Sequence, residues 1–415
     1  MKINSALVAS AATITLLASS QAGFAAKSNS DAAISNVAAQ QQQTQEQVDQ
    51  LSQRLDAIEA ELQQSEMRQA TDHDKVESWK AVSGWFDNTS ISGRMYFDIT
   101  DLNLKNAGAA SKNNGVSFDI KRFYIGIDHK FDDTFSANVT TDVTYDSNIS
   151  VSQIYIKKAF LQAKLDPAFT VIVGSTDMPW IPYAEGIYGY RFVENTLIDR
   201  VKFGNSADWG VFLTGKLADG LLEYKFSATT GAGYKKIIRT NQPDYEGRVS
   251  LHWEGLDLAV GGYIGHLGAQ HGTTTYHTAQ RLDALAAYTI EGLKVGVEYF
   301  TASNFTQVTS TTSSHAYGYS PFASYQFTPE WSVFGRYDYV KPYSDAARTS
   351  YHNNYYNVGI DYRPTKIVDL ALVFKQDSGS NGFYGDSNGT IGGTAFAPGS
   401  NGKDTEIGIW GDFQW

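Results

Sequence analysis

The stretch FSANVTTDVTY, residues 135–145, is decisive for the fold class. Its odd-numbered residues, from Phe135 through Val139 to Tyr145, are mostly apolar or aromatic, whereas its even-numbered residues, such as Asp142, are polar. Successive side chains of a β-strand point to opposite faces, so this alternation predicts a strand with one dry side and one wet side. The same alternation returns further along the chain, at 209–217, 256–264, 293–299 and 331–339.

The connections between the expected strands alternate strictly in length. Very short ones lie at 132–133, 166–167, 218–220, 254–255, 291–292, 328–330 and 364–365. Long polar ones lie between them, at 101–115, 230–246, 267–279, 303–317, 341–353 and 378–404. A soluble β-sandwich has no reason to sort its loops in this way, whereas a transmembrane β-barrel has tight turns at one end and long loops at the other. We therefore predict an all-β fold, a transmembrane antiparallel β-barrel of about sixteen strands over residues 84–415.

Aromatic residues gather at both ends of the expected strands, as in the two interfacial girdles of a membrane barrel. One group lies beside short turns and the other beside long loops: Phe131, Phe135, Phe169, Trp253, Phe327, Trp331 and Tyr362, and then Tyr145, Tyr155, Trp209, Tyr299 and Tyr339. The last segment, residues 407–415, alternates up to a terminal Trp415. It resembles the insertion signal of outer-membrane barrels, in which Phe is the usual last residue.

The composition argues against several kinds of function. The 415 residues carry a net charge of −11, whereas nucleic acids and anionic lipid surfaces bind basic proteins. No cysteine is present, so disulfides and thiolate metal sites cannot form. His266, His271 and His277 share one long connection, but their spacing matches no metal motif. No local catalytic or phosphate-binding motif occurs, so we expect no metal, no cofactor and no enzyme activity.

Residues 1–25 have the pattern of a signal peptide. Lys2 precedes a short apolar stretch, and the small residues Ala22 and Ala25 stand at the expected cleavage positions. A transmembrane helix needs about 20 mainly apolar residues, and this stretch is shorter and interrupted by Ser and Thr. We therefore expect the mature protein to be exported across the cytoplasmic membrane.

Residues 26–83 are expected to form a short α-helical coiled coil followed by a linker. Val48, Leu51, Leu55, Ile58 and Leu62 recur in steps of three and four, which predicts the seam of a heptad repeat. An isolated helix of this length is only marginally stable in water, so a partner helix is favoured over a lone solvated helix. The polar residues 65–83, of mixed charge, indicate the linker.

The third long connection, residues 177–206, differs from the others because it is rich in apolar and aromatic residues. Loops are normally polar and exposed, so this one is expected to leave the solvent. It either folds into the barrel and narrows the pore, or packs over the rim or against a neighbouring subunit. Its charged residues are candidates for a pore constriction: Asp177, Glu185, Arg191, Glu194, Asp199, Arg200 and Lys202.

The polar faces of the first four expected strands provide candidates for the pore wall: Arg94, Asp98, Arg122, Asp142, Lys158 and Lys164. If carboxylates of the third connection face this wall, a transverse electric field crosses the pore and orients polar solutes. Ordinary charge on a wetted wall is the alternative. In the second expected strand, the regular alternation between inward-facing and outward-facing residues shifts near Lys121.

The run at residues 169–174, followed by Pro179, Glu185, Arg191, Glu194, Asp199, Arg200 and the tetrapeptide 208–211, resembles the phosphate-selective porin O and P family. Residues 157–161 resemble the preceding strand of that family, so the resemblance covers about residues 118–217. It implies a sixteen-stranded, trimeric outer-membrane channel. Phosphate selectivity in that family depends on a dense basic pathway, whereas residues 81–415 carry a net charge near −7. We therefore do not carry phosphate binding over, and an amino-terminal coil, which resembles that of sugar porins, keeps sugar as an alternative.

These features together predict a homotrimeric porin in the outer membrane of a Gram-negative bacterium, with its coil in the periplasm. Its expected function is passive diffusion of small hydrophilic solutes or ions. A barrel enzyme of the phospholipase kind remains an alternative, because Ser, His and Asp are all available. An envelope tether that acts through the coil is a further alternative.

Overall fold

The computed structural model describes residues 30–106, 109–110, 114–146, 151–305, 308–342, 351–380 and 401–415. The signal peptide predicted at residues 1–25 lies outside these residues. The chain divides into two compact units, Met1–Ser83 and Gly84–Trp415, and each is described by itself.

The amino-terminal unit is dominated by one helix, α1 (Ser30–Asp87), of 58 residues. The expected seam residues Val48, Leu51, Leu55, Ile58 and Leu62 lie along it with 51–63% of their surface exposed. Residues 65–83, expected as a linker, are helical and continue α1 without a break, because no Pro occurs there to interrupt it. No described helix is both long and apolar enough to cross a membrane.

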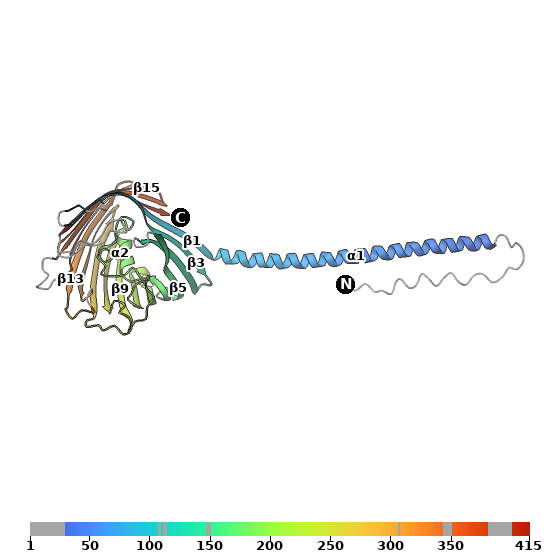
Figure 1. Ribbon diagram of the computed structural model, residues 1–415, viewed down its shortest axis with the longest axis horizontal. Helices are drawn as coiled ribbons and strands as arrows, with labels where there is room; N and C mark the ends of the chain where they lie inside the picture. Colours follow the sequence, from blue (N-terminus) through green and yellow to red (C-terminus); the bar gives the residue numbers. More distant parts are fainter. Residues whose placement is uncertain are drawn as a thin grey trace. The chain divides into compact units, whose positions relative to one another are not determined.

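The second unit is one closed antiparallel sheet (Figure 1). The strands pair in chain order, and β1 closes the barrel by pairing with both β3 and β17. Seventeen strands are described, of which β2 has only two residues, so sixteen long strands form the wall. Their bounds are β1 (Thr89–Asn106), β2 (Ala109–Ala110), β3 (Gly115–Lys130), β4 (Phe135–Asp146), β5 (Val151–Asp166), β6 (Phe169–Asp177), β7 (Ala207–Leu217), β8 (Leu222–Thr229), β9 (Asp244–Trp253), β10 (Leu256–Gly265), β11 (Ala279–Ile290), β12 (Leu293–Ser303), β13 (His315–Gln326), β14 (Trp331–Lys341), β15 (Asn353–Thr365), β16 (Val368–Gly379) and β17 (Gly402–Gln414).

The barrel fold predicted from alternation and loop lengths is therefore confirmed, with small differences at strand ends. β1 extends to Asn106, past the expected start of its connection at residue 101, because its backbone remains paired with β17 as far as Gly402. The turn expected at residues 364–365 lies one to two residues later, between Thr365 and Val368.

Short turns join the strands at one end of the barrel, here called the turn end; the other end is the loop end. Two turns consist of the pairs Glu254–Gly255 and Glu291–Gly292, whose φ angles of 45° and 84°, and 45° and 83°, are all positive. Positive φ at both central residues defines the tight hairpin turn that matches the twist of antiparallel strands, and glycine adopts it without steric cost. These turns account for the abrupt changes of strand direction.

The barrel has an apolar outer face and a polar inner face. Large apolar side chains such as Val173, Leu282 and Leu372 are 53–59% exposed on the outside. Charged side chains such as Glu298 and Asp338 are fully buried on the inside. This distribution is the reverse of that in a soluble protein and matches a barrel whose outer surface lies in hydrocarbon.

Candidate functional site

The connection between β6 and β7, residues 178–206, folds into the barrel and is called the inner loop below. It contains α2 (Ile181–Tyr188), with Pro182 in its first turn and Gly189 (φ 69°) at its end, and α3 (Leu197–Arg200). Figure 1 shows α2 among the strands of the barrel. Trp180, Leu197 and Ile198 are completely buried, which explains why a connection carries so many apolar residues.

The first half of the inner loop is fastened to strands β9 and β12. The Trp180 indole donates to one oxygen of Glu298 (2.7 Å), and the Tyr188 hydroxyl donates to the other (2.7 Å). The Trp180 backbone N–H donates to Glu246 (2.9 Å). Arg248 donates in turn to the backbone oxygen of Pro179 (2.9 Å). Hydrogen bonds to buried carboxylates are strong, so α2 has a defined position against this wall.

The second half of the inner loop is fastened to β14, β15 and β16. The Arg200 guanidinium donates to Asp338, Asp377 and Asn353, each at 2.8 Å. Glu194 accepts from Lys375 at 3.4 Å. Both loop residues are buried. Arg200 and Glu194, expected as constriction residues, therefore face the wall and hold the loop in place.

The opposite side of the barrel interior remains open next to the inner loop. A cavity of about 680 Å³ lies there, between the loop and strands β1, β3 and β5. Glu185 and Arg191 border it from the loop. The wall contributes polar and basic side chains: Arg94, Tyr124, Lys157 and Lys158. We call this space the open side.

Most charges at the open side are paired. Lys158 donates to Asp177 (2.5 Å), Arg191 donates to Glu185 (2.5 Å) and lies 3.6 Å from Asp199. Arg94 of β1 donates to Asp412 of β17 (2.6 Å). Burial disfavours the Arg191 cation, but Glu185 and Asp199 raise the pKa of its guanidinium well above the ordinary value. Arg191 therefore remains charged throughout the physiological pH range.

The other predicted residues have different surroundings. Asp98 forms a buried ion pair with Lys121 (2.9 Å), away from the open side. Asp142 accepts from Tyr155 (2.7 Å) and lies 3.7 Å from Arg122. Two predicted lysines are exposed: Lys164 on β5 near the turn end, and Lys202 at a left-handed backbone position (φ 61°).

Sequence reasoning missed three lysines of the inner wall or its loop end. Lys157 donates to the Tyr124 hydroxyl (3.2 Å) and lies over its ring at 4.6 Å. Lys235, in the connection after β8, lies 4.5 Å from the Tyr155 ring. Lys225 of β8 lies 5.6 Å from the Phe212 ring. Regular alternation would place Lys157 on the outer face, because its neighbour Lys158 points inward.

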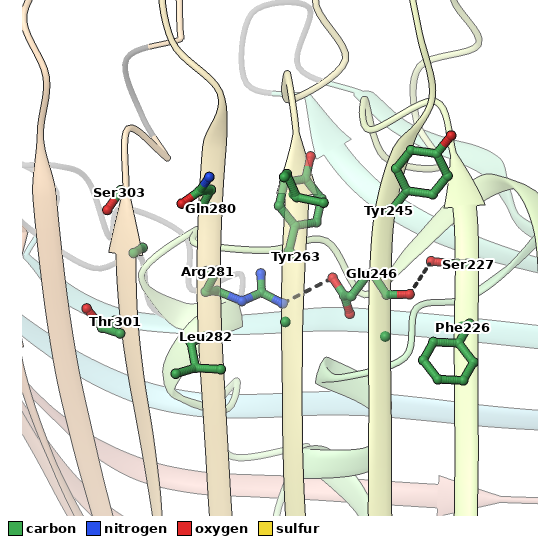
Figure 2. Close-up of a pocket in the computed structure, with 14 residues that line it drawn as sticks. Phe226, Ser227, Tyr245, Glu246, Tyr263, Gln280, Arg281, Leu282, Thr301 and Ser303 are labelled. Carbon is green, nitrogen blue, oxygen red and sulfur yellow. Dashed lines mark hydrogen bonds and ion pairs between the residues drawn. The ribbon is translucent and has the colours of Figure 1, made fainter.

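Figure 2 shows a second hollow, of about 620 Å³, across strands β8 to β12. Its apolar border residues Phe226, Tyr245 and Leu282 are about half exposed on the outer face of the barrel. The ion pair between Arg281 and Glu246 (3.0 Å) lies on the inner face behind it. The hollow therefore faces the surroundings of the barrel and does not belong to the open side. Within the described residues, no group of His, Asp and Glu side chains could hold a metal ion.

Comparison with solved structures shows porin-like barrels. The anion-selective porin of Comamonas acidovorans is 12% identical, with a TM-score of 0.60 over 78% of this chain and 99% of that one. OmpT of Vibrio cholerae in its trimer form is 12% identical, with a TM-score of 0.53 over 79% and 99%. The outer-membrane channel DcaP of Acinetobacter baumannii is 10% identical, with a TM-score of 0.53 over 79% and 97%. These likenesses establish the fold.

No protein-family model matches the chain, and no curated protein matches it either.

Proposed function

We propose that this protein is an outer-membrane porin of a Gram-negative bacterium, a water-filled channel for passive diffusion of small hydrophilic solutes and ions. The observation that carries the proposal is that the barrel has an apolar outer face and a polar interior, and that the inner loop fills this interior on one side only. Trp180, Tyr188 and Arg200 hold the loop against β9–β16, and the cavity of about 680 Å³ remains beside β1, β3 and β5.

The test is recording from planar bilayers after addition of purified protein. Stepwise, ohmic conductance increments are the expected result. Lipid hydrolysis without conductance would contradict the channel function and indicate a barrel enzyme. If neither conductance nor lipid hydrolysis is found, and cells whose protein lacks residues 27–80 have envelope defects, the result would indicate an envelope tether.

We further propose a preference for anions. Four basic side chains border the open side, Arg94, Lys157, Lys158 and Arg191, against two acidic ones, Asp177 and Glu185. Fields at a narrow point are set by the few groups that line it. Selectivity therefore follows these side chains, and the net charge of the whole chain does not determine it. The Comamonas acidovorans porin of similar fold is described as anion-selective.

We also propose a homotrimer whose amino-terminal helices form a coiled coil in the periplasm. The exposed apolar seam from Val48 to Leu62 supports a partner for α1, because apolar side chains at heptad positions are stabilised by burial against a second helix. The seam covers about two heptads, which is marginal alone. The barrels would therefore supply most of the association and hold the helices at high effective concentration. The OmpT structure of similar fold is described as a trimer form.

A further inference from the structure

Two β-bulges change which side chains of β3 and β5 reach the barrel interior. Tyr96 pairs with Arg122 and the next residue, Phe97, pairs with Ile120, so Lys121 is an extra residue in β3. Thr140 pairs with Lys158 and Thr141 pairs with Ile156, so Lys157 is an extra residue in β5. In a regular strand, adjacent residues point to opposite faces; a bulge places two consecutive side chains on one side.

Both extra residues are lysines next to another basic residue, and all four side chains point inward. Lys121 contacts Asp98, and Arg122 lies 3.7 Å from Asp142. In β5, Lys158 contacts Asp177, and Lys157 contacts the Tyr124 hydroxyl. Without the bulges, one cation of each pair would face hydrocarbon, which is unfavourable for a charged group.

The two bulged lysines have different environments. Lys121 is 3% exposed and has Asp98 as its counter-ion at 2.9 Å. Lys157 borders the open side, and its hydrogen-bond partner is the neutral phenol of Tyr124. Among the described residues, no carboxylate forms an ion pair with Lys157, whereas the carboxylates nearby are already engaged by Lys158 and Arg191.

We propose that the bulge in β5 places Lys157 in the pore as a cation that no carboxylate contacts directly, and that Lys157 is the main residue that selects small anions. This inference rests on the proposed channel function and names its solute class and selective residue. A permeating anion can take the place of a counter-ion at Lys157 without displacing a carboxylate. The same anion at Lys158 or Arg191 must compete with Asp177 or Glu185.

The experiment is measurement of reversal potential in a potassium chloride gradient, with full-length protein in planar bilayers. The variants are Lys157→Gln, which keeps the bulge, and deletion of Lys157, which restores regular pairing of β4 and β5. Lys366→Gln is the control, because Lys366 is exposed in the short turn between β15 and β16.

Both Lys157 variants should lower the anion-to-cation permeability ratio at least about fivefold. This is the Boltzmann factor for one unit charge about 4 Å from an anion in a water-like dielectric, and the same charge also repels cations. Lys366→Gln should keep the wild-type ratio. Wild-type ratios in both Lys157 variants, with conductance retained, would overturn the inference and leave the channel intact. A change in Lys366→Gln as large as in Lys157→Gln would also overturn it, because a lysine in an exposed turn would then have the same effect. Absence of conductance in the wild-type protein would instead refute the channel function itself.

Discussion

Arg200 and Asp338 are joined by a 2.8 Å ion pair in which both side chains are completely buried, 138 residues apart in sequence. The pair connects the inner loop to β14, and the same guanidinium also reaches Asp377 of β16 and Asn353 of β15. A buried ion pair contributes little net stability, but loss of one partner leaves the other charge buried and unpaired. Arg200 therefore anchors the second half of the inner loop against β14–β16.

Replacement of Arg200 by Met should release the inner loop from β14–β16. It leaves Asp377 buried without its cation and removes one of the two cations of Asp338, which keeps Arg336 at 2.6 Å. A broken buried pair costs about 3–5 kcal/mol. We expect noisy, flickering single-channel currents and a lower unfolding temperature of the folded barrel on gels. Lys202→Ala, two residues away and exposed, is the control and should behave as wild type. Quiet wild-type currents in Arg200→Met would show that the other anchors suffice.

Glu185→Gln and Arg191→Gln should shift ion preference in opposite directions. Glu185 holds Arg191 at 2.5 Å, so its neutralisation removes a negative charge next to a cation that borders the open side. Anion preference should then rise, whereas Arg191→Gln should lower it. Reversal potentials measure both changes, and Glu330→Gln in an exposed short turn provides the control. Shifts of the same sign in both variants would contradict this assignment of charges.

Anion preference should weaken as the pH rises from 7 toward 10. Burial first, and then the nearby cation of Arg122, lower the pKa of the Lys235 ammonium below its ordinary value of 10.5. Lys235 therefore loses its charge at a lower pH than an exposed lysine does, and one cation disappears from the loop end of the barrel. Lys235→Arg keeps the charge and should flatten the dependence in reversal-potential titrations. An equally steep titration in Lys235→Arg would assign the effect to another group.

Replacement of Leu51, Leu55 and Ile58 by Asp should abolish association of the amino-terminal helices but not of the barrels. Charges in an apolar seam prevent helix pairing, so the circular-dichroism signal of α1 should fall. A heat-resistant trimer band should remain on a gel. A variant that runs as a monomer would instead identify α1 as the oligomerisation element.

The strands, their turns and the closed barrel were all accessible from sequence, because they depend on short-range patterns. Alternation in residues 135–145 reports the two faces of a strand directly, and pairs such as Glu291–Gly292 mark hairpin turns through their backbone preferences. The apolar composition of residues 178–206 also indicated correctly that this connection leaves the solvent.

The tertiary structure alone decided which charges face the pore. Glu194 and Arg200 looked like constriction residues, but their partners Lys375 and Asp338 lie on strands far along the chain, and no local pattern reveals such pairs. The net charge of the barrel sums over all acidic groups, although several, including Glu298, lie buried beneath the inner loop. Lys157 faces inward only because it is an extra residue of β5 that has no partner in β4. That bulge is a property of the pairing between the two strands and cannot be read from either strand alone.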